Sequence, residues 1–200
     1  MKKLSYILIS FFLVINFALA SDYSSNPRLF VSELVNDAIS KLSDKDLTKD
    51  EKSNYIAAIA LKNVDIYALS LYTLGELRKS TDQKDLDRYQ QVFEKYFLKS
   101  LTSRLNDYSN NKFEIVDAEK KNSNYTIVKS KIVANDKNPE IKIDWRIYTK
   151  NPEKPLIRDL IVEGLSLART QKEEFASILS SNNNDINLLI TKLEEFLKSK

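Results

Sequence analysis

Apolar and polar residues alternate most clearly between 141 and 149. The apolar positions of this run are Ile141, Ile143, Trp145 and Ile147, and those between them are Lys142, Asp144, Arg146 and Tyr148. Because the side chains of a strand point alternately to its two faces, the pattern predicts one face on a core and the other in solvent. Weaker runs predict three more strands. One starts with Phe113 and Ile115, a second spans 125–133 and a third spans 156–163. We expect these four strands to form an antiparallel meander.

Before and after the strands, apolar residues recur at the three- and four-residue spacing of helices. One helix is predicted to begin at Asn26-Pro27, a second at the capping box of residues 48–51, and a long one at residues 80–83. The helix predicted over 64–77 is apolar around most of its circumference, so it should be largely buried. Asp65 at its start is either a helix N-cap or a site residue, and capping is the more common role.

The stretch 156–175 connects the last strand to the helices that end the chain. Its first residues are apolar and partly β-branched, as in a buried strand, and Gly164 then permits a sharp turn. Helical spacing follows, and either Ser166 or Thr170 can cap that helix. Helices first, strands next and helices last predict an α+β fold, with a curved antiparallel sheet of about four strands packed against helices on its concave face.

Residues 1–20 have the pattern of a secretory signal peptide. Lys2 and Lys3 precede an apolar run, and the small residues Ala18 and Ala20 mark a cleavage site. The alternative is a membrane anchor, but the run is short for a bilayer span and polar residues interrupt it. We therefore expect cleavage after Ala20, export from the cytoplasm, and a single domain over 21–200 that does not itself span a membrane.

Composition excludes several kinds of chemistry. The chain has no histidine and no cysteine, which rules out Ser-His-Asp and Cys-His catalysis and removes the commonest metal ligand. Its two glycines cannot build a nucleotide-binding loop. The formal charge is +3, and removal of Lys2 and Lys3 with the leader leaves +1, so no basic surface for nucleic acid is indicated. We expect no cofactor and no metal.

Carboxylate catalysis remains open from composition alone, because paired acids can act without histidine. The candidates are Asp65, Asp159 and Glu163. Nothing in their spacing distinguishes them from surface acids, so we interpret Asp159 and Glu163 as structural residues that cap turns or pair with arginines.

Three segments resemble the MlaC family, also called the toluene-tolerance family. They are D-L-I-V-E-G-L-S-L at 159–167 followed by Phe175, V-D-I-Y-A-L-S-L-Y-T-L-G at 64–75, and the aromatic helix from Tyr89 to Tyr108. The resemblance covers most of the mature chain. It implies a fold related to the NTF2-like one, which encloses an apolar cavity for acyl chains and leaves the headgroup exposed.

The resemblance also implies a function and partners. Proteins of this family bind diacyl phospholipid in the periplasm as the soluble component of an ABC-type lipid transport system that maintains outer-membrane lipid asymmetry. The implied partners are an inner-membrane ABC lipid transporter complex and an outer-membrane lipoprotein–porin complex. Two alternatives stay open at this point: a small exported NTF2-like enzyme that uses carboxylates in the same cavity, and a non-catalytic adaptor with a filled core.

Periodicity and the resemblance together give candidate binding residues. For the wall of the lipid pocket they are Val64, Leu69, Leu74, Phe93, Phe97, Ile143, Trp145 and Val162. For weak contacts with the headgroup they are Arg78, Lys79 and Arg169, which lie after the buried helix and after the last strand.

Overall fold

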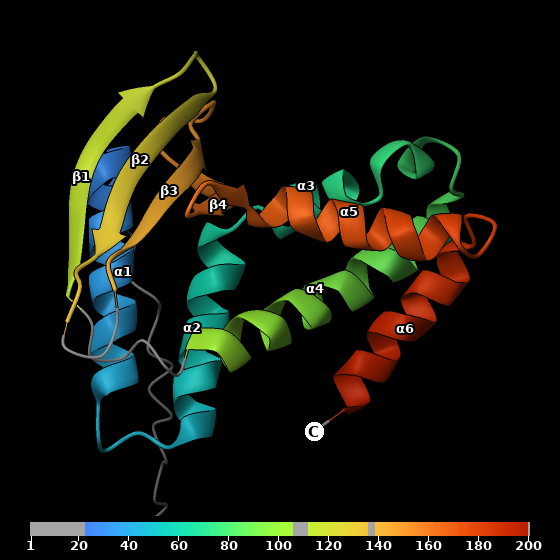
Figure 1. The fold of residues 1–200 in the computed structure, drawn as a ribbon, viewed down its shortest axis with the longest axis horizontal. Coiled ribbons are helices and arrows are strands. Elements are labelled where there is room, and N and C mark those ends of the chain that lie inside the picture. The colour runs from blue at the N-terminus through green and yellow to red at the C-terminus, as the bar shows by residue number, and fades with distance from the viewer. Residues whose placement is uncertain (1–22, 106–111, 136–138, 200) are drawn as a thin grey trace, which may run out of the picture.

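The computed structural model describes residues 23–105, 112–135 and 139–199 (Figure 1). The predicted leader, Tyr108 and the predicted turn residue Asn138 lie outside these ranges. The helices are α1 (Pro27–Ser43), α2 (Lys49–Asn63), α3 (Ile66–Thr73), the 3-10 helix η1 (Gly75–Lys79), α4 (Gln83–Leu105), α5 (Leu167–Ser180) and α6 (Ile186–Lys198). The strands are β1 (Phe113–Lys120), β2 (Tyr125–Ile132), β3 (Ile141–Tyr148), β4 (Leu156–Val162) and β5 (Leu165–Ser166).

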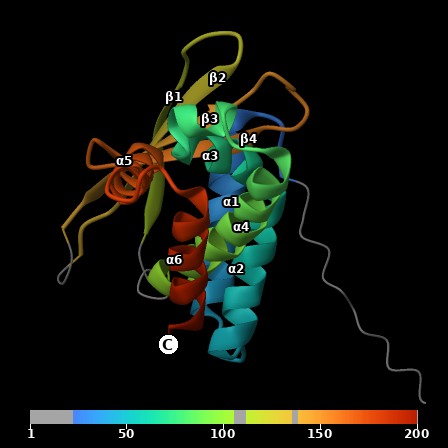
Figure 2. The same cartoon turned by 90° about the vertical axis from the view of Figure 1, so that its right-hand side faces the viewer.

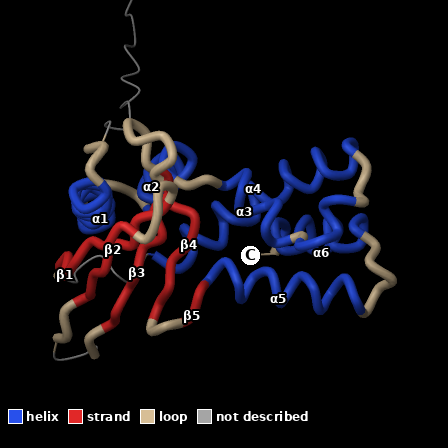
Figure 3. The backbone as a smooth tube through the Cα atoms, turned by 90° about the horizontal axis from the view of Figure 1, so that it is seen from above, coloured by secondary structure: helices blue, strands red, loops and turns tan. Residues whose placement is uncertain are grey.

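The five strands form one antiparallel sheet in the order of the sequence, β1 to β5 (Figure 3). The predicted meander and α+β class are therefore confirmed, and the two-residue strand β5 is an addition too short to have a pattern of its own. The register between β3 and β4 shifts after Arg146, because Ile147 faces Ile157 whereas Arg146 faces Asp159. Arg158 is the extra residue of this bulge, and a bulge re-aims the side chain that it carries.

One hydrophobic cluster lies between the sheet and the first two helices. It combines Phe30 and Val31 of α1 and Ile56 of α2 with Trp145 and Ile147 of β3. As the alternation predicted, Trp145 and Ile147 are buried while Arg146 between them is exposed. The indole Nε1 of Trp145 donates a 2.8 Å hydrogen bond to Ser130 Oγ, so its polar atom is satisfied inside the core.

A second cluster lies away from the sheet, where α3, α4, α5 and α6 pack on one another (Figure 3). Its centre is aromatic, with Phe93 of α4 edge-on to Phe175 of α5 at 6.3 Å between ring centroids. Tyr89 is completely buried, and its hydroxyl lies 2.7 Å from Thr73 Oγ1. Figure 2 shows α6 running beside α4, against which it buries Leu189, Ile190 and Leu193 of its apolar face. The molecule therefore has two cores.

Local sequence signals explain how these elements begin and end. Asn26 caps α1, and Thr48 and Glu51 form the predicted capping box of α2. The helix predicted over 64–77 is shorter than expected, because Gly75 adopts a left-handed φ of 57° and the chain continues as the 3-10 helix η1. Ser166, one of the two predicted caps, caps α5 by accepting from the Arg169 amide at 3.1 Å. None of the described helices combines the length and the apolar composition needed to cross a bilayer.

Candidate functional site

The two cores meet at the end of α2. Val64 packs against both clusters, and it forms an isolated parallel bridge with Ile157 of β4. The next amide, that of Asp65, donates a 2.9 Å hydrogen bond to the Ile157 carbonyl. We call this junction the seam. It ties the start of α3 to the sheet.

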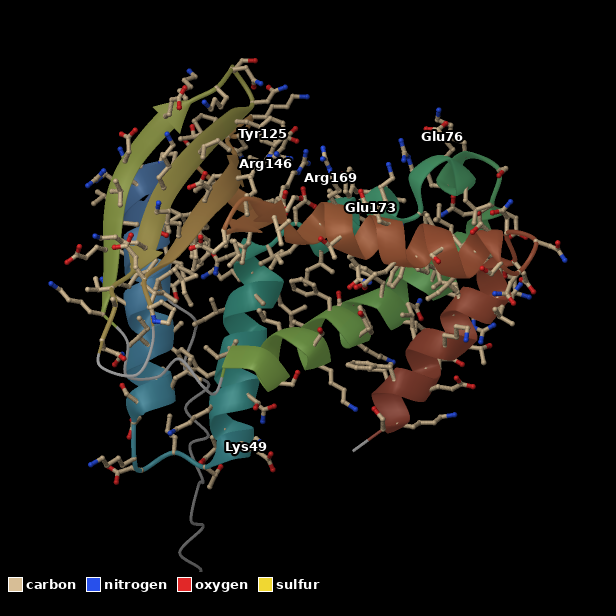
Figure 4. All side chains as sticks on the ribbon, in the orientation of Figure 1. Lys49, Glu76, Tyr125, Arg146, Arg169 and Glu173 are labelled. Carbon is tan, nitrogen blue, oxygen red and sulfur yellow. The ribbon has the colours of Figure 1, made fainter. Side chains whose placement is uncertain are left out.

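A hollow of about 200 Å³ lies beside the seam. Its walls come from α3, from the start of α5 and from the face of the sheet opposite α1, and they consist of Ala68, Leu69, Tyr72, Tyr125, Arg146, Arg158 and Ala168. A more open depression of about 560 Å³ continues along the same face of the sheet, and it is lined by Lys121, Asn122, Tyr125, Ile127, Lys129, Asp144, Arg146 and Ile161. The two share Tyr125 and Arg146, and together we call them the groove. Figure 4 shows both residues on the side of the sheet toward α5.

Arg158 fixes one wall of the groove to the seam. Its Nε and Nη2 lie 2.8 and 2.7 Å from Asp65 Oδ2, and its Nη1 donates to the Tyr125 hydroxyl at 2.9 Å. The guanidinium also stacks 3.4 Å from the centroid of the Tyr148 ring. Burial lowers the pKa of Arg158, but hydrogen bonds to Tyr125 and Asp65 outweigh that effect and raise it overall, so the side chain stays charged.

Two other charged groups of the groove are much less engaged. Arg146 Nη1 lies 3.7 Å from Asp159 Oδ2, which is beyond hydrogen-bond distance, and 45% of the Arg146 side chain is exposed. Asp159 is buried and already accepts from Ser166 Oγ at 2.6 Å and from the Ala168 amide at 3.0 Å. Among the described residues, Asp144 has neither a hydrogen bond nor an ion pair for its carboxylate. The groove therefore presents Arg146 and Asp144 with spare hydrogen-bonding capacity.

The structure distributes the predicted pocket-wall residues over both cores. Leu69 lines the groove, and Val64 lies at the seam. The others are buried or half-buried: Leu74, Phe93 and Phe97 in the second cluster, Ile143 and Trp145 in the first, and Val162 opposite Ile143 in the sheet. Their role as a lipid-contacting wall stays a prediction. The described residues form a groove whose walls are aliphatic, aromatic and charged.

The predicted headgroup residues lie outside the lining of the groove. Arg78 donates to the Gly75 carbonyl, and Lys79 pairs with Glu76 at 2.6 Å, so η1 uses both side chains locally. Arg169 stands on the first turn of α5, at the end nearest the sheet (Figure 4). Their contact with a headgroup also stays a prediction.

Of the groove residues, sequence reasoning predicted only Leu69, and the polar ones that it missed include Tyr125, Asp144, Arg146 and Arg158. The alternation in β3 did place Asp144 and Arg146 on the face away from the core. A ligand-binding role for that face could have been inferred from this signal. No local pattern marks Arg158, because a bulge places it and its partner Asp65 is 93 positions away.

Each of the three candidate carboxylates has a structural partner. Asp65 Oδ1 accepts from the Ala68 amide at 3.1 Å as the N-cap of α3, which confirms the capping interpretation, and its Oδ2 holds Arg158. Asp159 tethers the start of α5, and Glu163 accepts from the Lys142 amide at the end of β4. The interpretation of Asp159 and Glu163 as structural residues fits these bonds. Within the described ranges, no cluster of three or more acidic side chains could hold a metal ion.

Comparisons with known proteins connect this geometry to a family. The family model described as MlaC protein matches residues 32–195. No curated protein matches the chain. Among solved structures, the phospholipid-binding protein from Ralstonia solanacearum, determined in complex with a phospholipid, has the same fold. Its TM-score is 0.71 at 18% sequence identity, over 84% of this chain and 94% of that chain. Because the matched residues take in nearly all of both cores and the groove between them, the chain belongs to the MlaC family.

Proposed function

We propose that the protein binds a diacyl phospholipid, with the acyl chains entering at the seam and the headgroup in the groove. Membership of the MlaC family supports this proposal, and so does the fold shared with a protein that was solved with a phospholipid. The observation that carries it in this chain is the position of the groove. Its aliphatic wall, Ala68 and Leu69, lies toward the two cores, while its charged wall lies on the sheet.

The volume of the hollow limits how a lipid can enter. Pockets for drug-sized ligands measure about 300–1,000 Å³, so about 200 Å³ beside the seam is too small for two acyl chains. Lipid entry therefore has to move the two cores apart. Each core keeps its own packed interior, so opening the seam separates α3 from the sheet without breaking the sheet or the helical cluster.

We further propose that the protein is a periplasmic carrier between the inner and the outer membrane. Burial of an acyl chain contributes about 0.8 kcal/mol per methylene, so a lipid with roughly thirty methylenes needs on the order of 20 kcal/mol of compensation in the carrier. Release into water would be very slow. The lipid must then be transferred while the protein is in contact with a partner. The proposed partners are an inner-membrane ABC lipid transporter complex and an outer-membrane lipoprotein–porin complex.

Lipid analysis of the purified protein tests the binding proposal. The mature chain, residues 21–200, would be isolated from the periplasm of a Gram-negative host and analysed by native mass spectrometry and lipid extraction. We expect close to one diacyl phospholipid per protein. A lipid-free spectrum from folded protein would refute the proposal. Transfer of labelled lipid between vesicles with and without the ABC complex would then test the carrier role, which predicts transfer that depends on the complex.

A further inference from the structure

Asp144 and Arg146 stand side by side on one wall of the groove. They are two positions apart on β3, so both point away from the core that Trp145 enters. At about 3.3 Å of rise per residue, their Cα atoms are about 7 Å apart. Both line the open part of the groove, and Arg146 also lines the hollow beside the seam.

Arg158 and Lys121 of the groove are engaged elsewhere. Arg158 is held by Asp65 and Tyr125. Lys121 Nζ lies 2.6 Å from Glu119 Oε2, and Lys129, which faces Asp144 in the register of β2 and β3, has its Nζ 3.8 Å from the same oxygen. Within the described ranges, the Asp144 carboxylate has no hydrogen bond or ion pair, whereas Arg146 and Lys129 have only long ion pairs, at 3.7 Å to Asp159 and 3.8 Å to Glu119. Of these two cations, Arg146 lies on the same strand as Asp144 and lines both parts of the groove.

We propose that this pair recognises a zwitterionic phosphoester headgroup, one that carries a phosphodiester and a primary ammonium. The Arg146 guanidinium offers a planar fork of donors that matches phosphate oxygens. The Asp144 carboxylate accepts from an ammonium. Phosphoethanolamine lipids have this chemistry, whereas phosphoglycerol lipids have the phosphate without the ammonium. The inference rests on the proposed function, which it deepens by naming the headgroup class.

The spacing suits such a headgroup. Phosphorus and nitrogen are joined through four bonds of about 1.5 Å each, which gives an extended span of about 5 Å. Charge-assisted hydrogen bonds of about 2.8 Å at the two ends can then reach side chains whose backbone positions are about 7 Å apart. A phosphoglycerol headgroup has no ammonium to pair with the Asp144 carboxylate, so this residue favours the zwitterionic class.

A competition between two lipids tests the proposal. Purified protein would be incubated with excess vesicles of phosphatidylethanolamine and phosphatidylglycerol in equal amounts, re-isolated, and its bound lipids quantified by mass spectrometry. We expect wild type to be enriched in phosphatidylethanolamine. Asp144→Asn should lower the bound ratio by about threefold to fivefold, the range expected of a partly exposed charge pair, with total loading unchanged. Arg146→Gln should shift the ratio the other way and speed lipid loss.

Two control variants make the same charge changes outside the lining of the groove. They are Glu173→Gln on α5 and Lys49→Gln at the start of α2, and both residues are labelled in Figure 4. We expect neither to change the ratio of bound lipids by as much as the matched variant on β3. An equal effect of Lys49→Gln and Arg146→Gln would overturn the proposal, because it would show a general effect of charge instead of a site.

Other outcomes separate this proposal from the proposed function. If wild type and Asp144→Asn bind lipid with the same ratio, the headgroup site is refuted and lipid binding stands. If folded wild type takes up no lipid from the vesicles, both fail. A further arm uses glycerophosphoethanolamine, which has the headgroup without acyl chains. We expect it to leave bound lipid in place, and displacement of lipid by this soluble phosphoester would instead identify a site for free headgroups.

Discussion

Replacement of Asp65 by Asn isolates the ion pair that ties α3 to the sheet. Asp65 has two roles, because one oxygen caps α3 and the other binds Arg158. Asparagine is as good an N-cap as aspartate, so the substitution keeps the cap and removes the charge that faces Arg158. The guanidinium then stays partly buried without its counter-charge.

The size of the effect follows from the exposure of the pair. Removing one partner of a fully buried pair costs about 3–5 kcal/mol. Here 26% of the Arg158 side chain and 14% of the Asp65 side chain are exposed, so water partly compensates and we expect a loss of about 2–3 kcal/mol. For a chain of this length, that loss corresponds to a fall of roughly 5–10 °C in Tm.

Urea unfolding followed by circular dichroism measures this loss, and a double-mutant cycle with Arg158→Met isolates the coupling between the two residues. The control is Asp185→Asn, because Asp185 caps α6 through the Asn187 amide and has no ion pair among the described residues. We expect the control to cost less than about 0.5 kcal/mol. A cost of the same size for Asp65→Asn, or a coupling energy near zero, would refute the reasoning.

Three further predictions concern the two cores and one cap. Trp145→Phe removes the donor to Ser130 and should cost about 1–2 kcal/mol of unfolding free energy, measured in urea. Leu74→Asp should unfold the protein, since Leu74 is only 4% exposed. Leu69→Asp, in the groove, should stay folded by circular dichroism and lose bound lipid. The reverse result would place the lipid in the helical core. Hydrogen bonds from Thr48 lower the pKa of Glu51, so the capping box stabilises α2 fully above pH 4.5 and less as the pH falls through the lowered pKa. Thr48→Ala removes the hydroxyl donor and keeps the amide donor, so it should weaken this part of the pH dependence of stability, and an unchanged pH profile would contradict it.

Sequence patterns predicted the parts of the fold that local chemistry decides. The alternation around Trp145 defined a strand and its buried face, and Asn26, Thr48 and Asp65 marked three helix starts because a cap is a contact within one turn. The end of α3 was less predictable. Gly75 permits a left-handed residue without requiring one, so the change to a 3-10 helix depended on the packing around it.

The groove could not be predicted in the same way, since its walls come from segments far apart in the chain. Periodicity shows that Phe93 and Ile143 face a core, but it does not show that they face different cores. A bulge shifts the alternation by one residue, which is why Arg158 turns toward Asp65 and Tyr125. Such contacts become visible once the sheet and the helices are placed relative to each other.

The hydrogen bond from the Asp65 amide to Ile157 gives the seam a local reporter. Amide protons inside the two cores exchange with solvent only through larger unfolding events, whereas this proton becomes exposed whenever α3 leaves the sheet. Its exchange rate is therefore a measure of how often the two cores part. In deuterium, protection of this one amide would report the equilibrium between the closed and the open seam, without any lipid present.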